Sequence, residues 1–202
     1  MAKKKHITLE QAIPWILLIG GVIGLICSVI LTYDQIRIWQ NPNYLPACNL
    51  NPIVSCGNVI SSKQGDIFGI PSPFLGLLAF PAIATVGVVV LAGAKLKRWF
   101  WLGLQAGVIG GLIWALVLFF LSLYRVHALC PFCLTVDVVT YILVWYVTLY
   151  NVKAGVIRIP KGNAERVAVF ARKHHLDIIV LWFLIVTLFT LKHFWYYYGH
   201  YL

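Results

Sequence analysis

The sequence Cys130-Pro131-Phe132-Cys133 stands where a short polar stretch, Tyr124 to His127, meets an apolar segment that continues to Tyr150. Proline is tolerated in the first turn of a helix, because its missing N–H would have no partner there. If the helix starts at Cys130, both sulfurs lie on one face, close enough to form a disulfide. The helix start also favours a thiolate on Cys130. The motif therefore indicates a redox dithiol, with a structural disulfide or two reduced cysteines as alternatives.

The composition is that of a protein embedded in a membrane. Of the 202 residues, 61% are hydrophobic and 11% are charged, and the mean hydropathy is +0.86. The net charge of +10 comes from short basic runs between apolar segments, which is typical of topology determinants and not of a nucleic-acid surface. We predict an all-α polytopic membrane protein with five transmembrane helices: Pro14 to Tyr33, Pro73 to Ala94, Trp99 to about Leu123, Cys130 to Tyr150 and Asp177 to Phe194.

Small and polar residues inside these spans predict how the helices pack. Glycine allows a neighbouring helix to approach closely, and two sets of glycines are spaced to do so: Gly20, Gly21 and Gly24 in the first span, and Gly103, Gly107 and Gly111 in the third. Gln105 is expected to form a hydrogen bond to a neighbouring helix. Cys27 is expected to be a small apolar residue of the interior.

The segment from Asp34 to Pro71 is polar, rich in proline and glycine, and carries Cys48 and Cys56. A loop of this length is usually functional or disordered. Its bulky apolar residues, among them Leu45, Leu50 and Ile53, predict that it packs down as a cap. From the loop alone, a redox pair and a bridge that only staples the loop are equally open.

Lysine and arginine are unevenly shared between the two sides of the predicted fold. One side holds twelve of the sixteen, in the N-terminal tail, in the connector at residues 95–98 and in residues 151–175. The other side holds Arg37, Lys63, Arg125 and Lys192. The positive-inside bias therefore places the N-terminus in the cytoplasm. The cap and the Cys130 motif then lie on the periplasmic or extracytoplasmic face of the inner or plasma membrane, where disulfides persist.

Two cysteine pairs at one membrane face can act in series. A soluble dithiol can reduce an exposed disulfide, and a second pair at the membrane edge can pass the electrons on by thiol–disulfide exchange. Side chains cannot keep the electron pair, so a cofactor must accept it, and quinones dissolve in the bilayer. The predicted order is soluble partner, Cys48/Cys56, Cys130/Cys133, quinone.

The order of these motifs resembles the vitamin K epoxide reductase family, in its bacterial branch. The resemblance covers about Pro14 to Tyr150 and rests on the seven residues between Cys48 and Cys56, on Ser61-Ser62, on Gly69-Ile70-Pro71 and on the Cys-Pro-Phe-Cys motif. It implies a four-helix bundle around a quinone in residues 1–150, with residues 34–71 as a capping loop. Residues 151–202 would then form a basic connector and a peripheral fifth helix.

The same resemblance implies a role for each outer cysteine. Cys48 would meet the reduced partner, and Cys56 would pass electrons to Cys130. Cys130 would exchange with the loop, and Cys133 would lie beside the quinone, which would be of the ubiquinone or menaquinone type.

Three further residues would border the quinone. Ser62 matches a family serine near the site, and Ser72 stands where animal members have an asparagine; each is equally open to being an ordinary loop or cap hydroxyl. Asp137 departs from the family, because animal members have a tyrosine there. An ionisable group in a span defaults to a functional hypothesis. It would hydrogen-bond a quinone carbonyl or give it a proton, and an interhelical hydrogen bond is the equal alternative.

Together these features predict a membrane thiol–disulfide oxidoreductase that oxidises a DsbA-like thioredoxin-fold partner and reduces a quinone. Many bacterial members carry a fused thioredoxin-like domain, and this chain ends at Leu202, so we expect the partner on a separate chain. The alternatives are the same site acting as a vitamin K epoxide or quinone reductase, and a non-enzymatic membrane protein with bracing disulfides. We expect no metal site, because Cys130, Cys133 and His127 lack a clear fourth ligand.

Overall fold

A computed structural model describes residues 9–51, 53–62, 66–67, 69–157, 166, 169–171 and 173–195. Residues 1–8, Lys63, residues 158–165 and Arg172, which enter the predicted charge asymmetry, lie outside this part. The chain divides into two compact units, Met1–Val156 and Ile157–Leu202. The prediction of an all-α membrane protein with five spans is confirmed, because five helices are long and apolar enough to cross a membrane: Leu9–Gln40, Ser72–Leu91, Arg98–Val126, Pro131–Lys153 and His175–His193.

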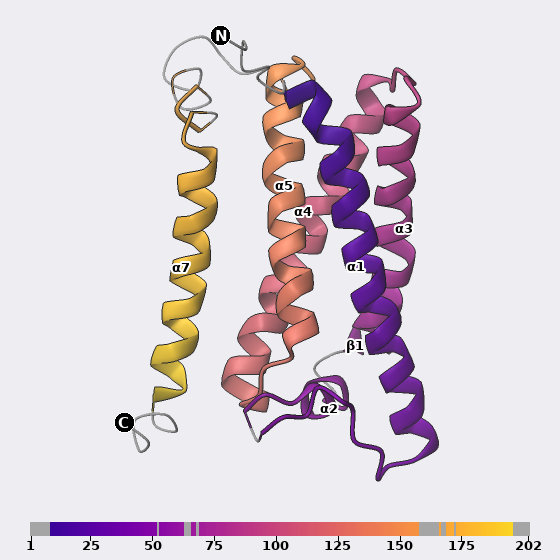
Figure 1. Ribbon diagram of the computed structural model, residues 1–202, viewed down its shortest axis with the longest axis vertical. Coiled ribbons are helices and arrows are strands. Elements are labelled where there is room, and N and C mark those ends of the chain that lie inside the picture. Colours follow the sequence, from indigo (N-terminus) through magenta and orange to yellow (C-terminus); the bar gives the residue numbers. More distant parts are fainter. Residues whose placement is uncertain are drawn as a thin grey trace, which may run out of the picture. The chain divides into compact units, whose positions relative to one another are not determined.

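The first unit is a bundle of four helices that run alternately up and down (Figure 1). They are α1 (Leu9–Gln40), α3 (Ser72–Leu91), α4 (Arg98–Leu121) and α5 (Pro131–Lys153). Helix α1 packs against α3 and α5, and α4 packs against α5. Among the described residues α3 and α4 have little contact with each other, although only a short connector joins them. The bundle is therefore loosely closed between α3 and α4.

The two sets of glycines behave differently. A methyl group on Gly21 would lie 2.6 Å from the backbone nitrogen of Ala84 in α3, so the predicted close approach of the first span is confirmed. The prediction for the third span is wrong. Among the described residues, an added Cβ would meet nothing within 4 Å at Gly103 or Gly107, and at Gly111 only the Thr140 methyl group, 3.7 Å away. None of the three is therefore a close-packing position against another described helix.

Helix α1 is longer than predicted and continues to Gln40, so residues 34–40 are helical and do not belong to the loop. The polar side chains in residues 34–40 led to the prediction that this segment belongs to the loop. Asp34 and Gln35 are nevertheless buried, because the cap packs on this end of the helix. The Tyr44 hydroxyl donates to Asp34 Oδ1 at 3.0 Å. The Gln35 amide, turned to satisfy both of its atoms, donates to the Ile60 carbonyl oxygen and accepts from Trp39 Nε1, each at 3.1 Å.

The polar stretch before Cys130 is also more helical than predicted. A π-helical turn, η2 (Ser122–Val126), extends α4 through Tyr124 and Arg125. The chain leaves it at His127, whose φ of 53° is left-handed. At the other end of α4, the Gln105 side chain donates to Thr148 Oγ1 of α5 at 2.9 Å, which confirms its predicted interhelical hydrogen bond.

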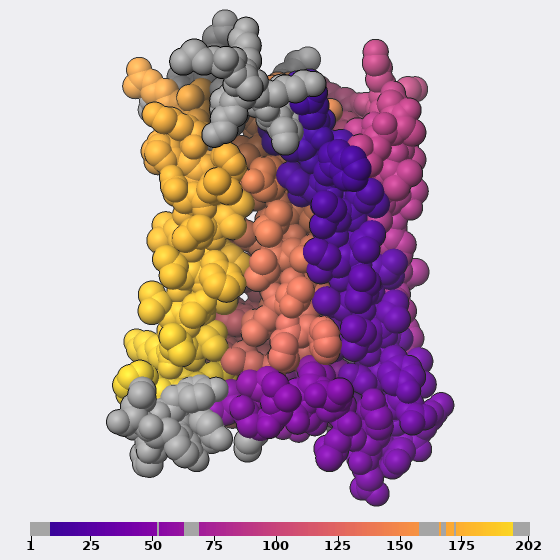
Figure 2. Space-filling view, viewed as in Figure 1, coloured from indigo at the N-terminus to yellow at the C-terminus, as the bar shows by residue number. Residues whose placement is uncertain are grey.

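The loop after α1 covers one end of the bundle, as Figure 2 shows in purple below α1 and α5. It contains a short helix, α2 (Cys56–Ile60), and a minimal hairpin, β1 (Asp66–Ile67) and β2 (Ile70–Pro71), that pairs Asp66 with Pro71 and Ile67 with Ile70. Ile53 and Ile60 are buried, as a cap requires. The prediction is wrong for Leu45 and Leu50, because both lie on the outward surface of this cap.

In the second unit, helix α7 (His175–His193) supplies the fifth candidate span. His174 precedes it, and its Nδ1 lies 2.8 Å from Asp177 Oδ2, which ties the first turn of the helix to the residue before it.

Candidate active site

A disulfide joins Cys48 to Cys56 inside the cap. Ser55 is the N-cap of α2, and its hydroxyl donates to Asn49 Oδ1 at 3.2 Å. Asn49 Oδ1 also accepts the Gly57 N–H at 2.9 Å. The residue after Cys48 is thus hydrogen-bonded to both residues that flank Cys56, so the ring closed by the disulfide is held from inside. Among the connectivities that the sequence left open, the structure has this one.

The second pair occupies the start of α5 with Pro131 in the first turn, as predicted. Cys130 is the N-cap, and its sulfur accepts the Cys133 N–H at 3.3 Å. Both cysteines are free thiols. The hydrogen bond from the Cys133 side chain is the main cause that lowers the pKa of the Cys130 thiol below its usual value. Burial opposes it, and the backbone N–H groups of Cys133 and Phe132 lower the pKa further. Cys130 therefore has the character of a nucleophile.

The two pairs meet at one sulfur–sulfur contact. Cys130 Sγ lies 3.3 Å from Cys56 Sγ, and the two cysteines are only 2% and 0% exposed. A cluster of buried residues surrounds them: Leu31, Cys48, Cys56, Ile60 and Cys130. Exchange between the pairs would therefore need no large movement and would take place away from solvent.

A backbone clamp explains this contact. Val54 and Leu129 form an isolated parallel β-bridge. The Leu129 N–H donates to the Ile53 carbonyl oxygen at 2.6 Å, and the Ser55 N–H donates to the Leu129 carbonyl oxygen at 3.0 Å. Since Cys56 follows Ser55 and Cys130 follows Leu129, the bridge brings the two cysteines side by side.

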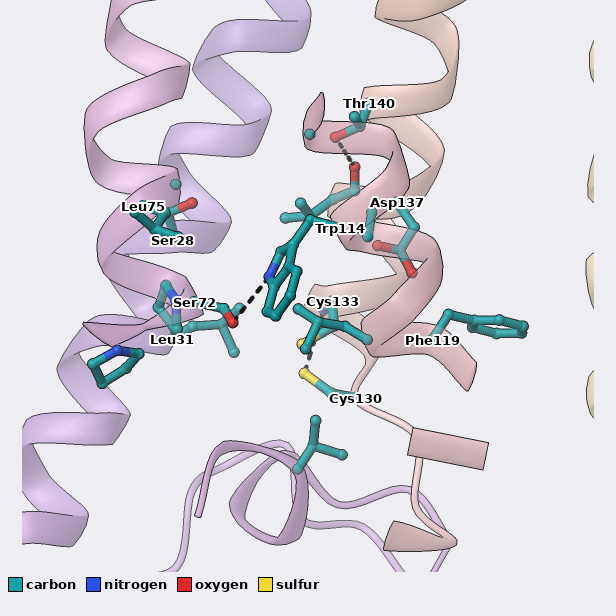
Figure 3. A pocket seen from close by; sticks show the side chains of 18 of the residues that line it. Ser28, Leu31, Ser72, Leu75, Trp114, Phe119, Cys130, Cys133, Asp137 and Thr140 are labelled. Carbon is teal, nitrogen blue, oxygen red and sulfur yellow. Dashed lines mark hydrogen bonds between the residues drawn. The ribbon is translucent and has the colours of Figure 1, made fainter. Parts of the chain in front are cut away.

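A cavity of about 580 Å³ lies among the four helices of the first unit, beneath the cap. Its lining is mostly apolar and includes Cys130 and Cys133 (Figure 3). The three other predicted ligand-binding residues, Ser62, Ser72 and Asp137, also line it. Cys48 and Cys56 are not part of the lining. The predicted site residues thus divide into a cap disulfide and a cavity, and Cys130 contacts the first and lines the second.

The polar groups of the cavity are few. Ser62 Oγ donates to the Val59 carbonyl oxygen at 2.7 Å. The Asp137 carboxyl makes no hydrogen bond within the part of the chain that the structure describes, so the alternative of an interhelical hydrogen bond is not observed there. Asp137 lies on the α5 wall beyond Cys133 (Figure 3).

Sequence reasoning missed Trp114. Its indole Nε1 donates to Ser72 Oγ at 3.3 Å across the cavity, between α4 and the start of α3 (Figure 3). A signal was present, because tryptophan normally gathers at the ends of membrane helices and this one lies within a span. The cavity also explains the glycines of α4: Gly107, Gly110 and Gly111 line it, and their missing side chains leave it open.

Residues 15–148 match the model of the vitamin K epoxide reductase family. The chain belongs to this family. The match spans the cap and most of the four-helix bundle, and its limits agree with the range of the resemblance drawn from the cysteine motifs. A comparison with curated proteins found no match. Family membership, together with a cap disulfide beside a second cysteine pair, identifies a membrane oxidoreductase with a redox function.

Proposed function

We propose that this vitamin K epoxide reductase family member oxidises a soluble DsbA-like thioredoxin-fold protein and delivers the electrons to a quinone. One observation carries the proposal: Cys130 lies 3.3 Å from the cap disulfide and, with Cys133, also lines the cavity. A cysteine pair in this position can receive electrons from the cap and present them to a ligand in the cavity.

The proposed route starts at Cys48. A partner thiolate attacks Cys48 Sγ, forms a mixed disulfide and releases Cys56 as a thiolate; the second partner thiol then resolves the mixed disulfide and leaves the partner oxidised. Cys56 attacks Cys130 in the oxidised form of its pair, the Cys130–Cys133 disulfide breaks, and Cys133 is released at the cavity. Cys48 then attacks Cys56, which restores the cap disulfide and returns Cys130 as a thiol. The structure has the redox state that follows: the cap is oxidised and Cys130 and Cys133 are reduced.

A quinone fits the chemistry of the cavity. When bound it would accept the two electrons and two protons, so that the Cys130–Cys133 disulfide forms again. A volume of about 580 Å³ lies in the ordinary range of small-molecule sites, and an apolar wall with a few polar groups suits a ring with two carbonyl oxygens. The little-packed side between α3 and α4 gives a lipid-soluble molecule a path from the bilayer.

Three polar residues would orient that ring. Ser62 comes from the cap, Ser72 from the start of α3, and Asp137 from α5, one turn beyond Cys133. We infer that Ser72, already paired with Trp114, holds one carbonyl oxygen. Asp137 lies on the same helix as Cys133, and we infer that it supplies a proton as electrons leave that sulfur.

The charge asymmetry supports a cap that faces the periplasm or cell exterior, with the N-terminus in the cytoplasm of an inner or plasma membrane. Disulfide exchange with a soluble partner requires such a compartment. The family match also supports a second candidate, reduction of vitamin K epoxide or quinone as the physiological substrate at the same cavity. Relative reduction potentials decide between the two directions.

The test is quinone consumption by the purified protein in detergent, driven either by a reduced DsbA-like protein or by dithiothreitol. We expect wild type to consume quinone with both reductants. Cys133→Ser should abolish consumption with both, and Cys48→Ser should abolish it with the protein but keep it with dithiothreitol. Cys27→Ser, at a free and buried cysteine of α1, is the matched control. If wild type consumes quinone with neither of the two reductants, the proposal is refuted.

A further inference from the structure

Two leucines of the cap are exposed to an unusual degree. Leu45 is 77% exposed and Leu50 is 74% exposed. They flank Cys48, three residues before it and two residues after it. Residues 41–62, which form the cap around them, contain no charged side chain. This stretch is therefore uncharged and its most prominent side chains are apolar, while Arg37 of α1 places its guanidinium carbon 5.5 Å from the centre of the Tyr44 ring.

The fold does not need these leucines. The apolar residues that seat the cap on the bundle are Ile53 and Ile60, and both are buried. An exposed apolar patch next to a reactive group indicates an interaction site.

Hydrogen bonds also hold the backbone near the two leucines. Asn51 Oδ1 accepts the N–H groups of Ile53 and Val54 at 3.0 and 2.6 Å, and the Leu50 N–H donates to the Val54 carbonyl oxygen at 2.9 Å. The Asn49 N–H donates to the Pro46 carbonyl oxygen at 3.0 Å, which closes a turn that contains Cys48. A surface held in this way loses little conformational entropy when it binds a partner.

The exposure of the two disulfide cysteines indicates which kind of molecule binds this surface. Cys56 is completely buried, whereas Cys48 is 8% exposed, so a thiolate from outside can reach the bond only at Cys48. A folded protein that brings a cysteine to Cys48 must lay the surface around that cysteine on the neighbours of Cys48. Leu45 and Leu50 are the neighbours that project.

We propose that Leu45 and Leu50 form the docking surface for the thioredoxin-fold dithiol partner, a surface that recognises an uncharged apolar rim around the partner's active cysteine. The inference rests on the proposed function and names its partner site. Docking precedes a balanced exchange. The partner thiolate bonds to Cys48 Sγ, Cys56 leaves as a thiolate, and the second partner thiol loses its proton and displaces Cys48, so two electrons pass from the partner to the cap pair.

The absence of charged side chains from residues 41–62 has a consequence for kinetics. Association that depends on charge slows as salt screens the charges, but apolar contacts between uncharged surfaces are not screened. The KM for the partner should therefore change little between low and high salt.

The experiment measures quinone consumption against the concentration of a reduced DsbA-like protein, and in parallel against dithiothreitol. The variants are Leu45→Ser, Leu50→Ser and the double variant. Ile70→Ser, at a half-exposed apolar residue of β2, is the matched control. We expect the double variant to raise the KM for the protein about tenfold, because buried apolar anchors dominate interface energies. The leucine variants should consume quinone with dithiothreitol at the wild-type rate. The Ile70→Ser variant should keep the wild-type KM for the protein.

The outcomes separate the inference from the proposed function. If wild type consumes quinone but the leucine variants keep the wild-type KM for the protein, the docking surface lies elsewhere and the inference is wrong. If the leucine variants lose as much activity with dithiothreitol as with the protein, the leucines stabilise the fold or the contact of the cap with the membrane. The inference is then also wrong. If wild type is inactive with both reductants, the proposed function fails and the inference fails with it.

Discussion

At the scale of single residues, Cys130 is poised to attack Cys56 as well as to be attacked by it. Their sulfurs are 3.3 Å apart, and Cys133 is the residue that would normally draw the electrons away. We therefore predict that in Cys133→Ser a Cys56–Cys130 disulfide with a free Cys48 thiol forms in exchange with the Cys48–Cys56 disulfide, because Cys133 can no longer displace Cys56 from Cys130, and that alkylation of Cys48 then traps it. Peptide mass spectrometry under non-reducing conditions measures the linkage after Cys48 has been capped by a small alkylating agent.

The control for this trap is Cys27→Ser, which should keep the Cys48–Cys56 linkage of the wild-type protein. Recovery of Cys48–Cys56 as the only linkage in Cys133→Ser, with Cys130 alkylated, would show that the two pairs do not communicate.

The pH dependence of the same exchange tests the cause of the Cys130 reactivity. The Cys133 thiol is the largest influence that lowers the pKa of Cys130. The thiolate is the reacting form, so the rate rises with pH and reaches half its maximum near that pKa. Cys133→Ala removes the donor, whereas Cys133→Ser keeps a hydroxyl in its place. We predict that the half-maximal pH is higher in Cys133→Ala than in Cys133→Ser, as measured by formation of the Cys56–Cys130 bond after a pH jump. Equal half-maximal values would mean that the side-chain hydrogen bond has no part in activating Cys130.

At the scale of helices, glycines with the same sequence pattern differ in what a side chain would meet. A methyl group at Gly21 would press on the backbone of α3, 2.6 Å from Ala84 N, whereas one at Gly103 would meet no atom of the described residues within 4 Å. We predict that Gly21→Ala destabilises the bundle by about 1–3 kcal/mol, the usual cost of overpacking. Gly103→Ala should be neutral or slightly stabilising. Thermal unfolding in detergent, followed by circular dichroism, gives the Tm of both variants, and an equal Tm would contradict the packing described for α1 and α3.

The sequence predicted the helices well where apolar runs were long, and less well where the cap altered the environment. All five spans followed from hydropathy, because a bilayer requires long apolar helices. The end of α1 did not follow, since Asp34 and Gln35 look like loop residues until the cap buries them. The glycines of α4 misled for a similar reason. Their spacing is that of a packed interface, and only the arrangement of α3 against α1 leaves a cavity beside them.

At the scale of the whole first unit, the candidate site depends on contacts between distant parts of the chain. The cysteine motifs predicted which residues belong together. Comparison with the family pattern predicted Ser62 and Ser72, and the presence of an ionisable group in a span predicted Asp137; the structure brings all three to one cavity. The Val54–Leu129 bridge could not be predicted, because it joins two irregular segments through backbone atoms alone. Trp114 required the structure for the same reason: its partner, Ser72, lies on another helix.

The orientation of the chain in the membrane decides whether this site can work, because a disulfide in the cap needs an oxidising compartment. Twelve of the sixteen lysine and arginine residues lie on the side opposite the cap by sequence order. We predict that a membrane-impermeant maleimide labels Cys48 from outside intact cells after mild reduction, in a variant that keeps Cys48 as its one cysteine. Sealed inverted vesicles should show no labelling until detergent is added. A cysteine placed at Lys97 by Lys97→Cys, in a chain without other cysteines, is the matched control and should give the opposite pattern. Labelling of Cys48 from inverted vesicles would reverse the topology, and it would exclude a partner in the periplasm or outside the cell.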